Sequence, residues 1–138
     1  MTRKKLFKTL STLIVFIFLV NFMAGILHLY YSIWYFDMPM HFLGGVFLGL
    51  LLICFFYTDI SEYTHGISLN FILKFLLSVL FIGVVWEVFE FIVNMFIAKS
   101  PFNLLDTISD VCFDCAGGFF VLLYLFKKYA RSMLKNEI

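Results

Sequence analysis

The sequence predicts an all-α polytopic membrane protein, a four-transmembrane-helix bundle with both termini in the cytoplasm. Composition is the first observation, because 63% of the 138 residues are hydrophobic and only 14% are charged. Soluble domains are nearer half apolar and a quarter charged. A globule of this size cannot hide 20 Phe and 7 Tyr residues in its core. Intrinsic disorder, a soluble enzyme and a disulfide-stapled secreted module are therefore excluded.

Four apolar stretches are long enough to cross a bilayer, which takes about 20 mainly apolar residues. They cover residues 9–31, 39–57, 69–98 and 108–126, within a single membrane domain of residues 1–138. The first stretch follows a basic start but shows no small-residue cleavage motif around 21–25, so we expect it to remain as an anchor. Pro39 suits the first turn of the second helix, and Pro101 is expected to end the third.

The distribution of basic residues predicts the orientation. Eight of the ten lie at the two ends of the chain: Arg3, Lys4, Lys5, Lys8, Lys127, Lys128, Arg131 and Lys135. Four spans place both ends on one side, and the positive-inside rule makes that side the cytoplasm. The expected location is therefore the plasma (inner) membrane, with multiple passes.

Polar residues gather in the outer half of the predicted bundle. Residues three, four or seven apart share one helix face, and each span carries one stripe of polar or small residues. The stripes are Asn21, Gly25 and His28; His41, Gly45 and Gly49; Gly83, Glu87, Glu90 and Asn94; and Asp106, Asp110, Asp114 and Gly117. Small residues let helices approach closely, and polar residues avoid lipid. The stripes are therefore expected to enclose an acidic pocket that opens outward.

This pocket has the composition of a divalent-metal site. Charged groups at membrane depth are expensive and usually functional, and clustered carboxylates repel one another unless protons or cations neutralise some of them. No intramembrane Lys or Arg is placed to pair with them. The expected metal ligands are His41, Glu87, Glu90, Asp110 and Asp114, with Asp37 and Asp106 as candidate catalytic residues that orient a ligand or act as base. Carboxylate-rich bundles hold metals in this way, and Mn, Zn, Fe and Mg all stay open.

Structural roles compete with this interpretation at several positions. Asp106 and Asp37 stand at helix starts, where an aspartate is often only an N-cap. His28 has the position of a packed or interfacial histidine. The Cys112-x-x-Cys115 spacing is typical of redox or zinc sites, but helical phase places both thiols roughly opposite the aspartate stripe.

Three polar motifs resemble those of a known family. They are Asp37-x3-His41-x2-Gly44-Gly45, WEVFEF at 86–91 and DTISDVCFDCAGG at 106–118. Together they resemble the VanZ-like superfamily of small bacterial membrane proteins, and look closest to its DUF2238/YjdF-like membrane-spanning branch. The resemblance implies that Asp37, His41, Glu87, Asp110 and Asp114 are the family's polar set. Glu90 replaces the glutamine of VanZ proper, whose arginine before the final motif is absent here.

Three functions would use these features differently. The first is a metal-dependent enzyme that acts on a membrane lipid, by hydrolysis or transfer at a lipid phosphate, with cations that offset phosphate charge and activate water. The second is a cation or proton transporter that uses the same carboxylates, and the third is a non-catalytic membrane scaffold. The enzyme is favoured because the inner halves of the helices look apolar and offer a transport path no continuation. A homo-oligomer stays open, and no nucleic-acid partner is expected.

Overall fold

The structure confirms an all-helical fold with four helices long and apolar enough to cross a membrane. This computed structural model describes residues 3–56, 68–98 and 102–136, and no strand occurs among them. Its elements are α1 (Arg3–Ile26), α2 (Leu29–Ser32), α3 (Asp37–Phe56), α4 (Leu69–Val93), the π-helix η2 (Asn94–Ala98) and α5 (Leu104–Asn136). The chain break expected at Pro101 lies outside the described residues.

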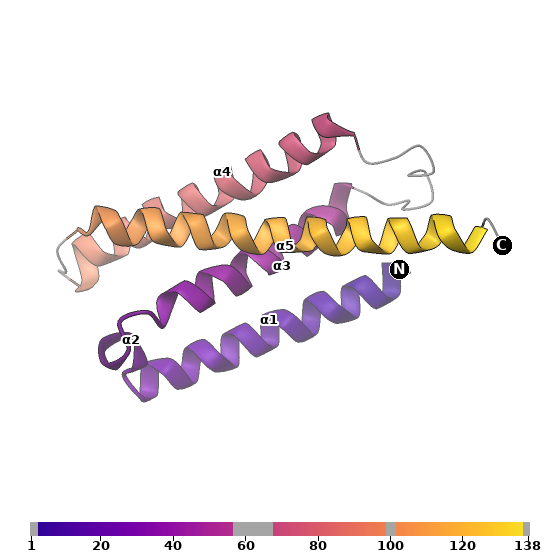
Figure 1. The fold of residues 1–138 in the computed structure, drawn as a ribbon. Coiled ribbons are helices and arrows are strands. Elements are labelled where there is room, and N and C mark those ends of the chain that lie inside the picture. The colour runs from indigo at the N-terminus through magenta and orange to yellow at the C-terminus, as the bar shows by residue number, and fades with distance from the viewer. Residues whose placement is uncertain (1–2, 57–67, 99–101, 137–138) are drawn as a thin grey trace.

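Helix α5 holds the bundle together because it packs against both α3 and α4. Helix α1 packs against α3, so the helices follow one another across the bundle in the order α1, α3, α5, α4 (Figure 1). Helix α1 begins and α5 ends at the same end of the bundle, as an even number of spans requires. We name the opposite end, where α3 and α5 begin, the distal end. The cytoplasmic placement of the termini stays a prediction.

Two glycines let α3 and α5 approach closely. A Cβ atom added to Gly45 would collide with the backbone of Asp114, and one added to Gly117 would collide with the backbone of Phe42. Both glycines are buried. Small residues at such contacts are the usual route to close helix packing in membranes, where van der Waals contact drives association. The stripes predicted on these two helices therefore do pack against each other.

The half of the bundle nearest the termini has an apolar core. Its buried members are Leu6, Leu10, Leu52, Ile53, Cys54, Phe71, Phe75, Val79, Val121 and Leu122. Gly49 lets this core close tightly, since an added Cβ would lie 3.2 Å from both Phe75 and Val121. The buried polar side chains of the described residues belong to the other half of the bundle: His41, Glu87, Asp110 and Asp114. The two halves therefore differ in the chemistry of their interiors.

Helix α1 departs from the predicted stripe. It ends just before His28, which adopts a left-handed backbone conformation (φ 54°) that a right-handed helix cannot continue. Asn21, Gly25 and His28 are all exposed, and nothing lies within 4 Å of a Cβ added to Gly25. The prediction that this stripe faces the bundle is wrong. The contacts of α1 with the core come instead from Leu6 and Leu10.

The other helix boundaries shift by a few residues. Helix α3 starts at Asp37, so Pro39 does occupy its first turn. The third span continues from α4 into the π-helix η2, which begins at Asn94. Helix α5 begins at Leu104, earlier than the predicted start at 108. Asp106 therefore lies inside the first turn of α5 and is not its N-cap.

We predict that Gly117→Ala lowers the free energy of unfolding by about 1–3 kcal/mol, because the added methyl group overpacks the contact between α3 and α5. Gly25→Ala is the matched control, since its methyl group meets open space and alanine favours a helix by up to about 1 kcal/mol. Thermal unfolding of the detergent-purified variants, followed by tryptophan fluorescence, measures the difference. Equal melting temperatures for the two variants would contradict the close contact.

Candidate metal centre

One imidazole ring lies among the buried carboxylates of the distal half. His41, on α3, has a side chain that is only 6% exposed. Its Nε2 atom lies 3.7 Å from Oδ1 of Asp37, one turn earlier on the same helix. Its Nδ1 atom lies 3.5 Å from Oδ2 of Asp114 on α5 and 3.8 Å from Oε1 of Glu87 on α4. Three helices thus bring acidic groups to the two nitrogens of one ring.

These nitrogen–oxygen separations, 3.5–3.8 Å, suit a coordination shell better than a hydrogen-bonded network. Hydrogen bonds between nitrogen and oxygen extend to about 3.2 Å. Metal–ligand distances of about 2.1 Å in a tetrahedral site separate neighbouring ligand atoms by about 3.4 Å. The side chains around His41 therefore stand slightly farther apart than the ligands of one bound ion, within the reach of small side-chain rotations.

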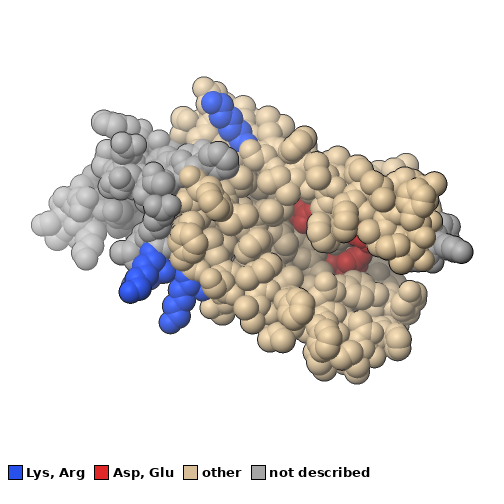
Figure 2. Space-filling view, turned by 180° about the vertical axis from the view of Figure 1, so that it is seen from behind, with Lys and Arg blue, Asp and Glu red and all other residues tan. Residues whose placement is uncertain are grey.

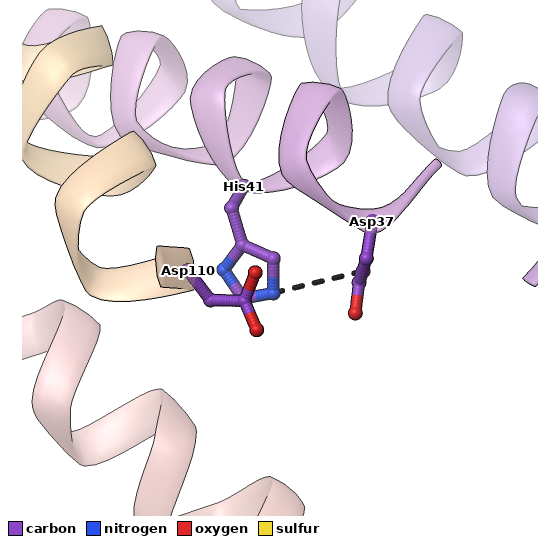
Figure 3. A group of neighbouring side chains, drawn as sticks. All are labelled: Asp37, His41 and Asp110. Atoms are coloured by element: carbon purple, nitrogen blue, oxygen red, sulfur yellow. Dashed lines mark ion pairs between the residues drawn. The ribbon is translucent and has the colours of Figure 1, made fainter. Parts of the chain in front are cut away.

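Two sets of three side chains have the spacing to hold an ion. Asp37, His41 and Asp110 form one set, and His41, Glu87 and Glu90 form the other. In each set, one ligand atom from every residue lies within 4.8 Å of the others. Figure 3 shows the first set, with the Asp110 carboxylate beside the His41 ring and Asp37 facing Nε2. His41 is the one member that the sets share.

Glu87 has a buried carboxylate oxygen that no donor of the described residues satisfies. The residue is 8% exposed, and its Oε1 atom is buried without a hydrogen-bond partner. An unsatisfied buried acceptor costs about 1–3 kcal/mol, and more when it is charged. Among the described residues, the ion pairs of the cluster involve only His41. No lysine or arginine in that part of the chain supplies the opposing charge.

Glycines make room for the Asp114 carboxylate. A Cβ atom added to Gly83 would lie 2.9 Å from Oδ2 of Asp114, and one added to Gly44 would lie 3.5 Å from Oδ1. The Gly83 distance is shorter than any ordinary contact to a Cβ atom, whereas the Gly44 distance is a normal van der Waals contact. The bare backbone of α4 at Gly83 therefore lets the carboxylate lie beside it and face His41.

A cavity of about 770 Å³ opens beside the cluster, between α4, η2 and α5. Its carboxylates are Glu87, Glu90, Asp106 and Asp110. Figure 2 shows acidic side chains recessed in a depression, away from the end of the molecule that carries the basic side chains. Ligand sites usually have volumes of about 300–1,000 Å³, so the cavity has the size of a binding site.

The predicted site residues differ in their surroundings. His41, Glu87, Asp110 and Asp114 are buried, Asp37 and Glu90 are partly buried, and Asp106 is exposed. Asp106 lines the cavity but belongs to neither set around His41. Asp114 approaches His41 closely, although it too lies outside the two sets of three. Whether any of these side chains binds a metal stays a prediction.

Two further polar residues, Asn103 and Thr107, line the cavity and are missing from the predicted site. Thr107 lies one turn before Asp110 on the same face of α5, and Asn103 immediately precedes that helix. The predicted helix start at 108 left them in a loop, whereas α5 begins at Leu104. Extending the aspartate stripe backward by one turn would have included them.

Tyr30, in α2, lies within the electrostatic reach of the cluster. Its hydroxyl donates a hydrogen bond of 2.7 Å to Oδ1 of Asn21, and its ring meets Phe36 edge to face, with centroids 5.2 Å apart. Burial first, and then the negative charges of Asp37 and Glu90, raise the pKa of the Tyr30 phenol to about 12. The field of the carboxylates therefore extends to the turn between α1 and α3.

Comparisons with known proteins connect the chain to a family of membrane proteins. A family model described as "Predicted membrane protein (DUF2238)" matches residues 1–131. No curated protein and no solved structure matches the chain. The matched range includes every residue of the cluster and of the cavity.

We predict that Glu87→Gln keeps or raises the melting temperature when a chelator is present, because the amide removes a buried charge and can donate a hydrogen bond to a neighbouring carboxylate. The expected gain in the free energy of unfolding is on the order of 1 kcal/mol. Glu90→Gln, at a partly buried position on the same helix, should change stability less. A large loss of stability in Glu87→Gln alone would show that the fold itself requires this carboxylate.

Proposed function

The chain belongs to the DUF2238 family of predicted membrane proteins, and we propose that it is a divalent-cation-dependent enzyme that hydrolyses the phosphate ester of a membrane lipid. The observation that carries the proposal is the buried Oε1 atom of Glu87, which has no hydrogen-bond partner and lies 3.8 Å from Nδ1 of His41. A cation beside both atoms would satisfy that oxygen and offset the charge of its neighbours. Imidazole and carboxylate ligands are compatible with Mn, Zn or Fe, and carboxylates with Mg.

The walls of the cavity favour an amphiphilic substrate. Beside its carboxylates, the cavity is lined by Phe91, Met95 and Phe102, whose side chains are exposed at its edge. The rings of Phe91 and Phe102 meet edge to face, with centroids 5.4 Å apart. A phosphate head group at the cation and a hydrocarbon chain along these apolar side chains would match both kinds of wall.

The proposed reaction is the hydrolysis of the lipid phosphate ester by water. A bound cation offsets phosphate charge and lowers the pKa of a water molecule. The water oxygen forms a bond to phosphorus, and the bond between phosphorus and the lipid oxygen breaks, so the products are inorganic phosphate and a lipid alcohol. Asp106, exposed in the cavity wall, accepts the proton that the water loses and returns it to the departing alcohol oxygen. Asp37 lies beside Nε2 of His41 and would help to hold the cation there.

A transport function would need a polar path through the whole bundle. In the half nearest the termini, the buried side chains of the described residues are apolar. Gly49 packs there against Phe75 and Val121, which leaves no room for a row of polar groups. A catalytic site needs access from one side only, so the enzyme is preferred over the transporter. Location in the plasma membrane and kinship with the VanZ-like superfamily stay predictions from the sequence.

Metal analysis of detergent-purified protein, combined with a phosphate-release assay, tests the proposal. We expect bound metal in the wild type and a lower metal content in the Glu87→Gln, Asp114→Asn double variant, whereas Cys112→Ser, at an exposed position on α5, keeps the full content. Phosphate release from phosphatidic acid in mixed micelles should require the same metal. In the double variant it should fall by more than the roughly 10- to 100-fold typical of losing an outer-shell partner.

The two measurements separate the parts of the proposal. A wild-type protein that neither retains nor takes up Mn²⁺, Zn²⁺, Fe²⁺ or Mg²⁺ would overturn it entirely. Stoichiometric metal without phosphate release from either phosphatidic acid or a polyprenyl phosphate would leave the metal centre and overturn the reaction. Cation flux into liposomes that depends on Glu90 would favour the transporter instead.

We also predict that Gly83→Ala weakens metal binding by about 10- to 100-fold, because its methyl group pushes against the Asp114 carboxylate and a change in ligand orientation has effects of this size. Gly44→Ala is the matched control, since its methyl group makes only an ordinary contact with the same carboxylate. Equilibrium dialysis against Mn²⁺ gives both affinities. Similar affinities for the two variants would show that Asp114 is not held in place by α4.

A further inference from the structure

We propose that the centre holds two divalent cations, one on each side of His41, with the imidazole ring as the bridge between them. The inference rests on the metal binding proposed above and does not depend on the reaction. It adds the number of ions, their separation and the ligand that connects them.

Each ring nitrogen of His41 faces a different set of carboxylates. Nε2 of His41 faces Asp37 at 3.7 Å, whereas Nδ1 faces Asp114 at 3.5 Å and Glu87 at 3.8 Å. The lone-pair directions of the two ring nitrogens diverge, so a single ion can bind only one of them. Each nitrogen therefore has its own acidic neighbour at a distance that suits a shared ion.

Different helices supply the carboxylates of the two sets around His41. The set with Asp37 and Asp110 comes from α3 and α5, whereas the set with Glu87 and Glu90 comes from α4, and His41 alone belongs to both. Asp114 approaches the Nδ1 side. Carboxylate bundles with two metals likewise take Glu and His ligands from several facing helices. Two partial coordination shells thus share one imidazole ring. This arrangement suits two ions bridged by that ring.

The negative charge of the cluster also favours two cations. Six carboxylates belong to the cluster or the cavity wall: Asp37, Glu87, Glu90, Asp106, Asp110 and Asp114. Among the described residues, no lysine or arginine forms an ion pair with them. One divalent cation beside a neutral ring offsets two carboxylates and leaves four, whereas two cations also balance the negative charge of the bridging ring, so they offset three carboxylates and leave three. Repulsion between like charges is strong in a low-dielectric interior. The negative charge that remains beside the first ion would therefore attract a second ion.

The bridge has a chemical consequence that can be measured. A neutral imidazole has one lone pair on its nitrogens, so binding of the second cation releases the remaining ring proton to solvent. The two ions would lie about 6 Å apart, given metal–nitrogen bonds of about 2.1 Å on each side of the ring. This separation exceeds the roughly 3.5–4 Å of two-metal phosphoryl-transfer sites.

Equilibrium dialysis of the full-length, detergent-purified protein against Mn²⁺ tests the inference by stoichiometry. We expect two ions for each wild-type chain, and one ion in Asp37→Asn and in Glu87→Gln, because each substitution disables one side of the ring. Cys112→Ser should retain two. Electron paramagnetic resonance should show broadening from coupled Mn²⁺ ions in the wild type and the spectrum of an isolated ion in both single-site variants.

The alternative outcomes are distinct. One ion in the wild type, lost in either variant, would overturn the bridged pair and keep the proposed metal centre. Loss of both ions from either single variant would show one undivided site and would also overturn the inference. No bound ion in the wild type would overturn this inference together with the proposed function. If Asp37→Asn or Glu87→Gln does not fold, Asp110→Asn and Glu90→Gln test the same two sides.

Discussion

The backbone contact between α3 and α5 determines how the side chains of the candidate centre lie relative to one another. Gly45 and Gly117 remove the side chains that would hold these helices apart. Asp114 lies at this contact, and His41 lies one turn before Gly45 on α3. The close approach therefore leaves only 3.5 Å between the imidazole and the carboxylate. Helix α4 completes the arrangement, because Gly83 gives the same carboxylate room on its other side. A larger residue at any of these glycines would separate groups that have to share a small space.

The two halves of the bundle contribute opposite terms to stability. The apolar half buries side chains from all four long helices and packs them through van der Waals contact, the main source of helix association in a membrane. The distal half buries carboxylates, one of which has an oxygen without a hydrogen-bond partner, and this lowers stability. Residues that stay unfavourable in the folded protein are characteristic of functional sites. The apolar half therefore offsets the unfavourable burial that the candidate centre requires.

Composition and periodicity were sufficient to predict four membrane-crossing helices and the polar faces of α3, α4 and α5. They could do so because a bilayer fixes the length of a span and the helical repeat fixes which residues share a face. The same repeat could not show whether another helix covers that face. On α1 it does not, and Asn21 and Gly25 are exposed. The helical repeat could not predict the nitrogen–oxygen distances around His41 either. These distances depend on how far each helix is rotated about its axis and on the side-chain rotamers.

The contribution of α5 to both sides of the centre has a consequence for biogenesis. Helices α3 and α4 precede α5 in the chain, so His41 and Glu87 are synthesised before Asp110 and Asp114. Until α5 packs against them, the polar groups on α3 and α4 lack these two carboxylate neighbours. Helix α5 brings Asp110 and Asp114 beside His41, and it does so through the glycine contact with α3. A chain that stops short of α5 would therefore lack the helix beside the Glu87 carboxylate, which is buried in the folded bundle.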